Sequence, residues 1–110
     1  MGEKTASDAL RRLSPEKVLI FASMIWQNQP SVAADVSERA SKIIQTAYEK
    51  KPAFFAGKSK KGILSGLFYH LGFNTGDVKT QQEIARALGT NEMTIRASCR
   101  DWLESFPEFF

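Results

Sequence analysis

Residues 80–106 carry two helix signals that follow each other closely. The stretch Thr80-Gln81-Gln82-Glu83 has a threonine and, three residues later, a glutamate, which is typical of a capping box at the start of a helix. Leu88-Gly89 is predicted to end that helix, because glycine adopts the left-handed conformation at low cost. A second helix is expected to begin at Thr90 or Asn91. A short helix, a turn with glycine and a second helix define a helix-turn-helix, which we predict at residues 80–106.

The second of these helices has two distinct faces. One set of apolar residues, at spacings of i, i+4, i+7 and i+11, is expected to pack inward: Ile95, Cys99, Trp102 and Phe106. Another set, at spacings of i, i+3, i+4 and i+7, forms what we call the reading face: Met93, Arg96, Ala97 and Arg100. Arginine can contact guanine with two hydrogen bonds, and Met or Ala can lie against a thymine methyl group. The reading face therefore indicates recognition of DNA bases; the alternative is a helical pair that only packs, with solvated arginines.

The rest of the chain shows helical spacing and no alternation typical of strands. Ser14-Pro15 predicts a helix start, and the helices are expected at about residues 15–29, 31–50 and 59–71. The sequence thus predicts an all-α fold with five helices in a single domain, residues 14–110, after a flexible N-terminal segment, residues 1–13.

Several apolar and small residues of these three helices are assigned to the core. Leu19 is placed in the apolar stripe of the first helix, Phe54 and Phe55 are expected to plug the core, and the third helix is expected to be central. Gly62 and Gly66, four residues apart, are costly inside a helix, so we expect them to allow close approach of another helix.

Positive charge is concentrated in one half of the chain. Residues 1–49 hold six Lys/Arg and six Asp/Glu, residues 50–100 hold nine Lys/Arg and three Asp/Glu, and residues 101–110 hold three acidic residues, so the net charges are 0, +6 and −3. Such asymmetry is typical of a polyanionic partner.

Three lysines, Lys58, Lys60 and Lys61, stand at the predicted start of the third helix. Cations at a helix N-terminus oppose the helix dipole, at a cost of ~0.3–1 kcal/mol each. A phosphate group there would accept the free N–H groups and neutralise the lysines. The predicted phosphate-binding residues are these three with Lys79, Thr80 and Gln81; the alternative for the lysines is a solvated basic turn.

Other functions find little support in the sequence. We expect no enzyme, because no nucleophile–base pair and no carboxylate pair is recognisable. Neither a cofactor nor a metal is expected, since the chain has one cysteine, Cys99, and one histidine, His70, which we interpret as a partly buried helix residue. No run of apolar residues is long enough to span a bilayer, and the first residues lack a signal-peptide pattern, so a soluble intracellular protein is predicted.

Three segments in this order resemble the end of the second cyclin-like repeat of transcription factor IIB and of its archaeal counterpart, transcription factor B: Lys79-Thr80-Gln81-Gln82-Glu83-Ile84-Ala85, Leu88-Gly89-Thr90-Asn91-Glu92-Met93-Thr94-Ile95-Arg96 and Trp102-Leu103. Upstream, Gly57-Lys58-Ser59 with Gly62-Ile63 and Leu67-Phe68-Tyr69 is similar to a fourth segment of that family. The resemblance covers about residues 14–110 and is densest over residues 57–100.

The resemblance implies a cyclin-like domain of five helices that reads promoter DNA beside the TATA box. Met93 matches the family's base-contacting valine, Arg96 its base-contacting arginine and Thr94 the threonine between them. It also implies the TATA-binding protein as a partner, a monomeric state, and a cytoplasmic location if the source is archaeal, which we favour, or a nuclear one if it is eukaryotic.

The sequence departs from the family pattern at three positions: Lys60 replaces a proline, Thr90 a valine and Cys99 a tyrosine. One cysteine cannot build the family's zinc ribbon, and a first cyclin repeat is missing. We therefore expect either an excised domain or a shortened relative, without the parts that recruit polymerase. Two alternatives stay open: a cyclin-like module that binds a protein, and a dimeric helix-turn-helix repressor of palindromic sites.

Overall fold

A computed structural model describes residues 13–110, and these residues form helices without any strand. The five α-helices in this range are α2 (Pro15–Ile25), α3 (Pro30–Lys50), α4 (Lys60–Gly72), α5 (Gln81–Leu88) and α6 (Glu92–Ser105). Two short 3-10 helices, η1 (Pro52–Phe55) and η2 (Pro107–Phe109), follow α3 and α6. The all-α prediction is confirmed. The segment predicted to be flexible lies outside the described residues, except for Leu13, which is buried in the core.

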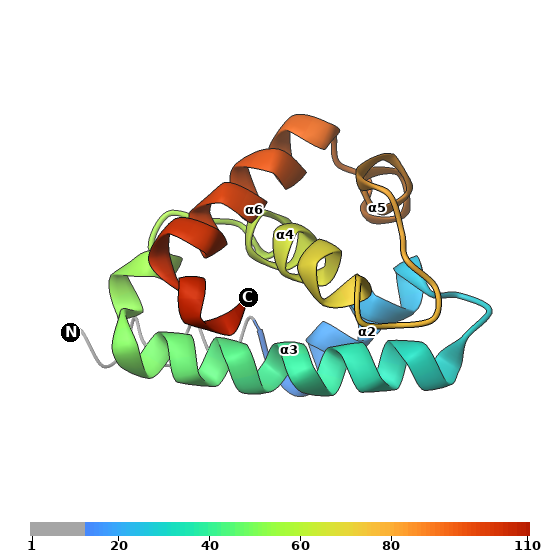
Figure 1. The fold of residues 1–110 in the computed structure, drawn as a ribbon, viewed down its shortest axis with the longest axis horizontal. Helices are drawn as coiled ribbons and strands as arrows, with labels where there is room; N and C mark the ends of the chain where they lie inside the picture. Colours follow the sequence, from blue (N-terminus) through green and yellow to red (C-terminus); the bar gives the residue numbers. More distant parts are fainter. Residues whose placement is uncertain (1–12) are drawn as a thin grey trace.

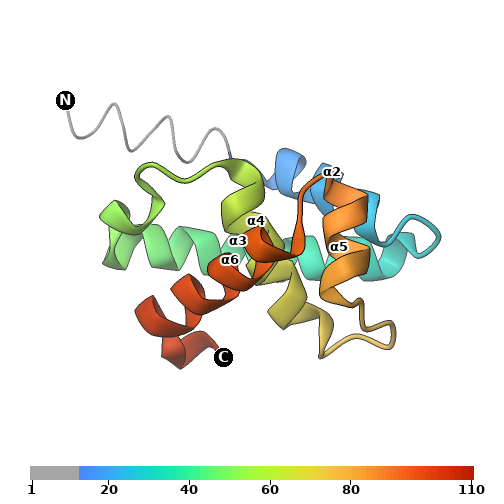
Figure 2. The same cartoon turned by 90° about the horizontal axis from the view of Figure 1, so that it is seen from above.

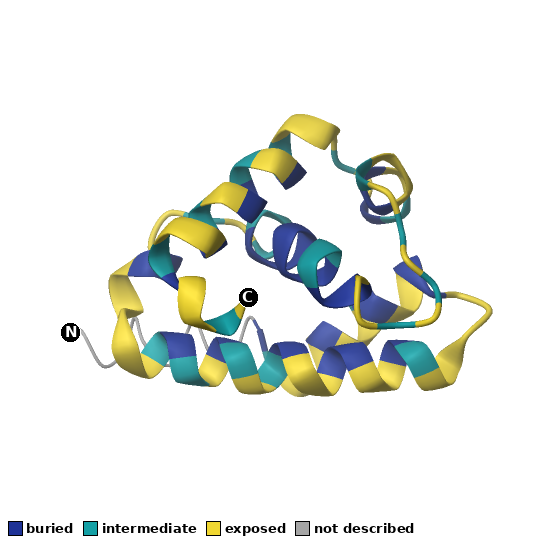
Figure 3. Cartoon of the chain, in the orientation of Figure 1, coloured by how far each residue is buried: buried dark blue, intermediate teal, exposed yellow. Residues whose placement is uncertain are grey.

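Helix α4 lies in the middle of the molecule, with α3 along one side and α6 along the other (Figure 1). α6 crosses over α4 (Figure 2). α5 lies beside this crossing and contacts α2. α6 packs mainly on α4, and α2 packs mainly on α3. α4 is buried along nearly its whole length (Figure 3), as its apolar composition predicts.

The crossing of α4 and α6 depends on one glycine. A Cβ atom placed on Gly66 would lie 2.5 Å from the backbone nitrogen of Cys99, so no side chain fits there. Ser98 Oγ accepts a hydrogen bond from the Gly66 N–H at 3.0 Å and donates one to the Ile63 carbonyl oxygen at 3.3 Å. The indole N–H of Trp102 donates to the same carbonyl at 2.8 Å. The inner face of α6 is therefore held on α4 by both packing and hydrogen bonds.

Two aromatic residues of η1 close the core near the end of α6, as predicted. Phe54 and Phe55 are buried, and the Phe54 ring lies 4.6 Å from the Trp102 ring and 5.1 Å from the Phe106 ring, measured between centroids. The end of α6 is tied to the end of α3, because Lys51 Nζ donates a hydrogen bond to the carbonyl oxygen of Ser105 at 2.7 Å.

Three predictions about the first half of the chain and α4 are wrong. The first helix ends at Ile25 and not near residue 29, because Trp26 leaves the helical conformation. Leu19 is exposed and does not join the core stripe of that helix. Gly62 does not contact another helix: it lies in the first turn of α4, where its N–H donates to Ser59 Oγ at 3.0 Å.

Within residues 13–110, no helix combines the length and the apolar character that crossing a membrane requires.

Candidate nucleic-acid interface

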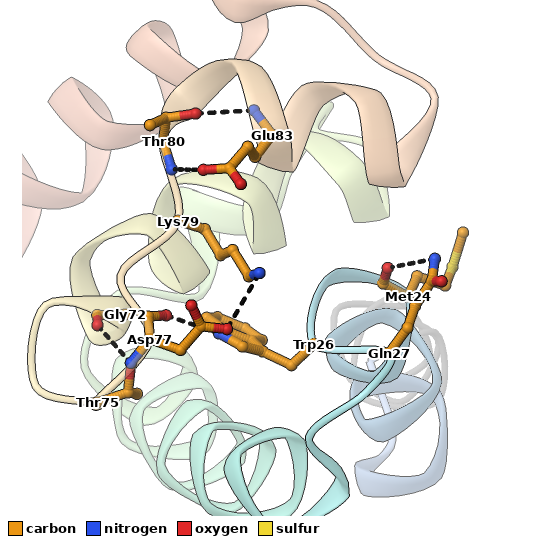
Figure 4. A network of polar contacts seen from close by, with 9 residues as sticks. All are labelled: Met24, Trp26, Gln27, Gly72, Thr75, Asp77, Lys79, Thr80 and Glu83. Atoms are coloured by element: carbon orange, nitrogen blue, oxygen red, sulfur yellow. Dashed lines mark hydrogen bonds and ion pairs between the residues drawn. The ribbon is translucent and has the colours of Figure 1, made fainter.

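The start of α5 is fixed by the predicted capping box (Figure 4). Thr80 Oγ1 accepts a hydrogen bond from the Glu83 N–H at 3.0 Å, and Glu83 Oε1 accepts one from the Thr80 N–H at 3.0 Å. The bond from the Thr80 N–H to the Glu83 carboxylate holds the pKa of Glu83 below its ordinary value, because the bond favours the ionised form. Glu83 thus stays charged and keeps the first turn of α5 closed.

The loop before α5 is anchored to the end of α2 (Figure 4). The Trp26 indole N–H donates to the Asp77 carbonyl oxygen at 2.9 Å, and the Asp77 N–H donates to Thr75 Oγ1 at 3.1 Å. The Asp77 carboxylate pairs with Lys79 Nζ at 3.0 Å, and both residues are half-buried. Because Trp26 is itself buried, this network fixes the position from which Thr80 starts α5.

The turn between α5 and α6 is short and well capped. Gly89 adopts the left-handed conformation, with φ of 67° and ψ of 39°, and the Thr90 N–H donates to the Ala85 carbonyl oxygen at 2.9 Å. Asn91 Oδ1 then accepts hydrogen bonds from the Thr94 N–H at 2.9 Å and from the Thr94 hydroxyl at 3.2 Å. Three residues, 89–91, thereby set the direction of α6 relative to α5.

The two predicted faces of α6 are confirmed as a buried face and an outward face. Ile95, Cys99, Trp102 and Phe106 are all buried. On the reading face, Met93, Arg96 and Arg100 are exposed and Ala97 is half-buried. Met93 is 76% exposed, the highest value among the exposed large hydrophobic residues described. Met93 therefore presents an apolar side chain to solvent in the first turn of α6, on the same face as Arg96 and Arg100.

Arg96 is the residue of the reading face with partners from two helices. Its Nε–H donates to Gln81 Oε1, on α5, at 3.3 Å. Its NH2 atom lies 4.0 Å from Glu92 Oε1, one turn earlier on α6. The side chains of Arg96 and Glu92 are 63% and 47% exposed, so this ion pair is weak.

The three lysines near the start of α4 have different surroundings. Lys58 Nζ donates to the Phe54 carbonyl oxygen at 2.6 Å and lies 4.4 Å from the centre of the Phe54 ring, so it fastens η1. Lys61 Nζ lies beside the α5–α6 turn, 3.5 Å from where a Cβ atom on Gly89 would stand. Lys60 is half-buried in the first turn of α4. The structure thus brings Lys61 next to the helix pair, whereas Lys58 has an internal role.

The remaining predicted phosphate-binding residues gather at the other end of α5. Lys79 is half-buried against Asp77, Thr80 is exposed as the N-cap, and Gln81 is half-buried against Arg96. Lysines therefore lie near both ends of α5: Lys61 near its last turn and Lys79 just before its first.

The single cysteine and the single histidine lie in the packing around α4 and α6. Burial raises the pKa of the Cys99 thiol to about 11, so the thiol stays protonated at neutral pH. His70 is half-buried, as predicted, and its Nε2 lies 3.4 Å from the Cys99 carbonyl oxygen.

Sequence reasoning missed the two contacts that position the site. The Trp26–Asp77 bond joins residues 51 positions apart, and the Arg96–Gln81 bond joins residues 15 positions apart on different helices. No local pattern signals the first. The second could have been suspected, because Gln81 opens one helix of the pair and Arg96 lies one turn into the other.

Comparison with known proteins gives two similar curated proteins, both archaeal. Transcription initiation factor IIB 1 of Thermococcus kodakarensis is 24% identical over 95 residues, which are 84% of this chain and 31% of that protein. Transcription initiation factor IIB of Caldivirga maquilingensis is 31% identical over 68 residues, 62% of this chain and 20% of that protein. The chain is thus similar, at low identity and over part of their length, to proteins named transcription initiation factor IIB. This confirms the resemblance, whereas the assignment to the second repeat stays a prediction.

The matched part is less than a third of the length of either relative. No protein-family model matches the chain, and no solved structure matches it significantly.

Proposed function

We propose that the chain binds duplex DNA in a transcription factor IIB-like role in transcription initiation, and that α5 and α6 act as a helix-turn-helix. α6 enters the major groove of promoter DNA beside the TATA box, with the reading face toward the base edges. The observation that carries this proposal is the separation of the two faces of α6. One face is fully buried on α4, and the other offers Met93, Arg96 and Arg100 to a partner.

The charged surroundings of α6 support a nucleic-acid partner. Lys61 lies beside the α5–α6 turn, and Lys60 precedes it in the first turn of α4. Lys79 and Thr80 lie at the opposite end of α5. Phosphate contacts on both sides of a reading helix fix its register on the duplex without carrying sequence information. Lys60 and Lys61 are the strongest phosphate candidates, because Lys58, Lys79 and Gln81 have partners within the protein.

The test compares Arg96→Ala with Lys60→Ala in titrations of a labelled duplex followed by fluorescence anisotropy. Arg96→Ala is expected to cost ~1–3 kcal/mol and to relax the preference at one base pair. Lys60→Ala is expected to weaken all sequences alike and to reduce the slope of log K against log salt by about one. Lys42→Ala removes the same charge from α3, on the other side of α4, and should change neither quantity. Equal and small effects of Arg96→Ala and Lys60→Ala would overturn the proposal.

The TATA-binding protein is the proposed partner, on the strength of the family resemblance. The same titration with and without that protein, at two salt concentrations, measures its contribution. We expect binding at low salt without it and tighter binding with it. If no duplex binds under any of these conditions, a cyclin-like module for protein binding becomes the better account. A dimeric mass in solution with a preference for palindromic sites would instead indicate a repressor.

A further inference from the structure

We propose that Gln81 is a positioning residue that presents Arg96 to a guanine, and that it is not primarily a phosphate ligand. The inference rests on the proposed DNA recognition by α6. The observation behind it is the hydrogen bond from the Arg96 Nε–H to Gln81 Oε1 at 3.3 Å, which joins the first residue of α5 to the second turn of α6.

This bond decides which edge of the guanidinium is free. Arginine carries five N–H donors in a planar fork, one on Nε and two on each terminal nitrogen. Gln81 takes the donor on Nε and therefore leaves the donors of the two terminal nitrogens, at the end of the fork, for another partner. Guanine offers two acceptors in the major groove, O6 and N7, which match such a pair of donors. Gln81 thus selects the orientation of Arg96 that suits a guanine.

The position of Gln81 is itself fixed from both sides. It lies inside the capping box, between Thr80 and Glu83, as the first residue of α5. The preceding loop is anchored through Asp77 to the buried Trp26 (Figure 4). An arginine held by such a residue loses less rotational freedom when it binds than one that moves freely in solvent, because part of the ordering has occurred before DNA arrives.

The second partner of Arg96 behaves differently. Glu92 Oε1 lies 4.0 Å from NH2, one of the terminal nitrogens that guanine requires, and this pair is well exposed. A contact so long and so hydrated is easily exchanged. On binding, guanine therefore replaces Glu92 at the end of the fork, whereas the bond from Nε to Gln81 stays.

A positioning role and a phosphate-binding role for Gln81 have different consequences. Loss of a phosphate contact weakens all sequences alike. Loss of the residue that orients Arg96 lowers discrimination at the one base pair that Arg96 contacts. The two roles are therefore separated by the ratio of affinities for two duplexes, the preferred one and one in which that G·C pair is replaced by A·T.

The experiment measures this ratio for wild type, Gln81→Ala, Arg96→Ala and the double variant, with Gln82→Ala as the control from the exposed neighbouring position. Arg96→Ala should remove discrimination on the order of 10- to 100-fold. Gln81→Ala should remove a large part of it, and it should change nothing further when Arg96 is already Ala. Gln81→Glu keeps the acceptor for Nε, so it should retain discrimination while it weakens both duplexes by charge repulsion. Gln82→Ala should leave the ratio unchanged.

A measurement on the protein without DNA distinguishes failure of this inference from failure of the proposed function. In ¹H–¹⁵N spectra, the Arg96 Nε–H signal should shift in Gln81→Ala and stay in place in Gln82→Ala. An unmoved signal, or equal weakening of both duplexes by Gln81→Ala that adds to the effect of Arg96→Ala, would overturn the positioning role even if DNA recognition holds. Absence of duplex binding by the wild-type protein would overturn the proposed function and this inference with it.

Discussion

At Gly66, α4 and α6 approach so closely that no side chain fits between them, and this contact helps to set the orientation of α6. A methyl group at this position would meet the backbone at Cys99, which cannot move away as a flexible side chain can. It would also disturb the hydrogen bond from the Gly66 N–H to Ser98 Oγ. The orientation of the reading face therefore depends on a residue without a side chain.

Gly66→Ala is expected to destabilise the protein by ~1–3 kcal/mol, the usual cost of overpacking a filled contact. Urea unfolding followed by tryptophan fluorescence measures the free energy of unfolding. Gly76→Ala provides a control, because no heavy atom outside its own segment lies within 4 Å of the added Cβ, and it should change stability by less than about 0.5 kcal/mol. If Gly66→Ala were as stable as wild type, the close crossing of α4 and α6 would be contradicted.

At the scale of one element, α5 is a helix of eight residues that needs its capping box. A helix so short is marginal alone, so its ends and its packing decide whether it forms. Ile84, Ala85 and Leu88 are buried and supply the packing, whereas Thr80 and Glu83 satisfy donors at the first turn. Both the start of the proposed helix-turn-helix and the placement of Gln81 depend on this cap.

The cap should give the protein a specific response to acid. The folded state lowers the pKa of Glu83 below its ordinary value of 4.5, so the ionised carboxylate contributes stability at pH values above 4.5. This contribution is lost as the pH falls through the lowered pKa. Glu83→Gln can still accept a hydrogen bond but does not titrate. The difference in unfolding free energy between wild type and Glu83→Gln should therefore be largest above pH 4.5 and shrink in acid, as urea titrations over a pH series will show. A difference that does not vary with pH would count against the cap.

Helix boundaries were predictable where the signal is local. The starts at Pro15 and Gln81 and the glycine turn at Gly89 agree with the structure, because the residues that cap these ends lie within four positions of them. The end of α2 was not predictable, because Trp26 leaves the helix to donate a hydrogen bond to Asp77, far along the chain. Gly62 was misjudged for a related reason: spacing alone does not tell which of two glycines faces a neighbouring helix.

At the scale of the whole molecule, α4 is the platform that positions the proposed DNA-binding elements. α6 packs on it through a fully buried face, and α5 contacts α2, α4 and α6. The N-terminal turn of α4 also carries Lys61 to the α5–α6 turn. A central buried helix thus brings together the reading face and a basic group that are separate in the sequence.

The candidate site was only partly predictable at this scale. Helical spacing in α6 suffices to separate the reading face from the buried face, because both faces belong to one element. Helical spacing does not predict the partners of Lys58 or Gln81. The Lys58 ammonium group is bonded to the Phe54 carbonyl oxygen, and Gln81 accepts a hydrogen bond from Arg96. Charge or position alone assigns those side chains to phosphates, whereas their contacts depend on how separate elements meet.

The central claim is that Arg96 on α6 contacts a guanine in the major groove, and methylation interference tests it most directly. A duplex selected from a random pool by the wild-type protein is methylated at guanine N7, which removes one of the two acceptors that an arginine fork uses. We predict that methylation of one guanine weakens binding by wild type and has no effect on binding by Arg96→Ala, whose affinity is already reduced. If methylation has no effect on wild type, or weakens both proteins equally, Arg96 does not contact a guanine in the major groove.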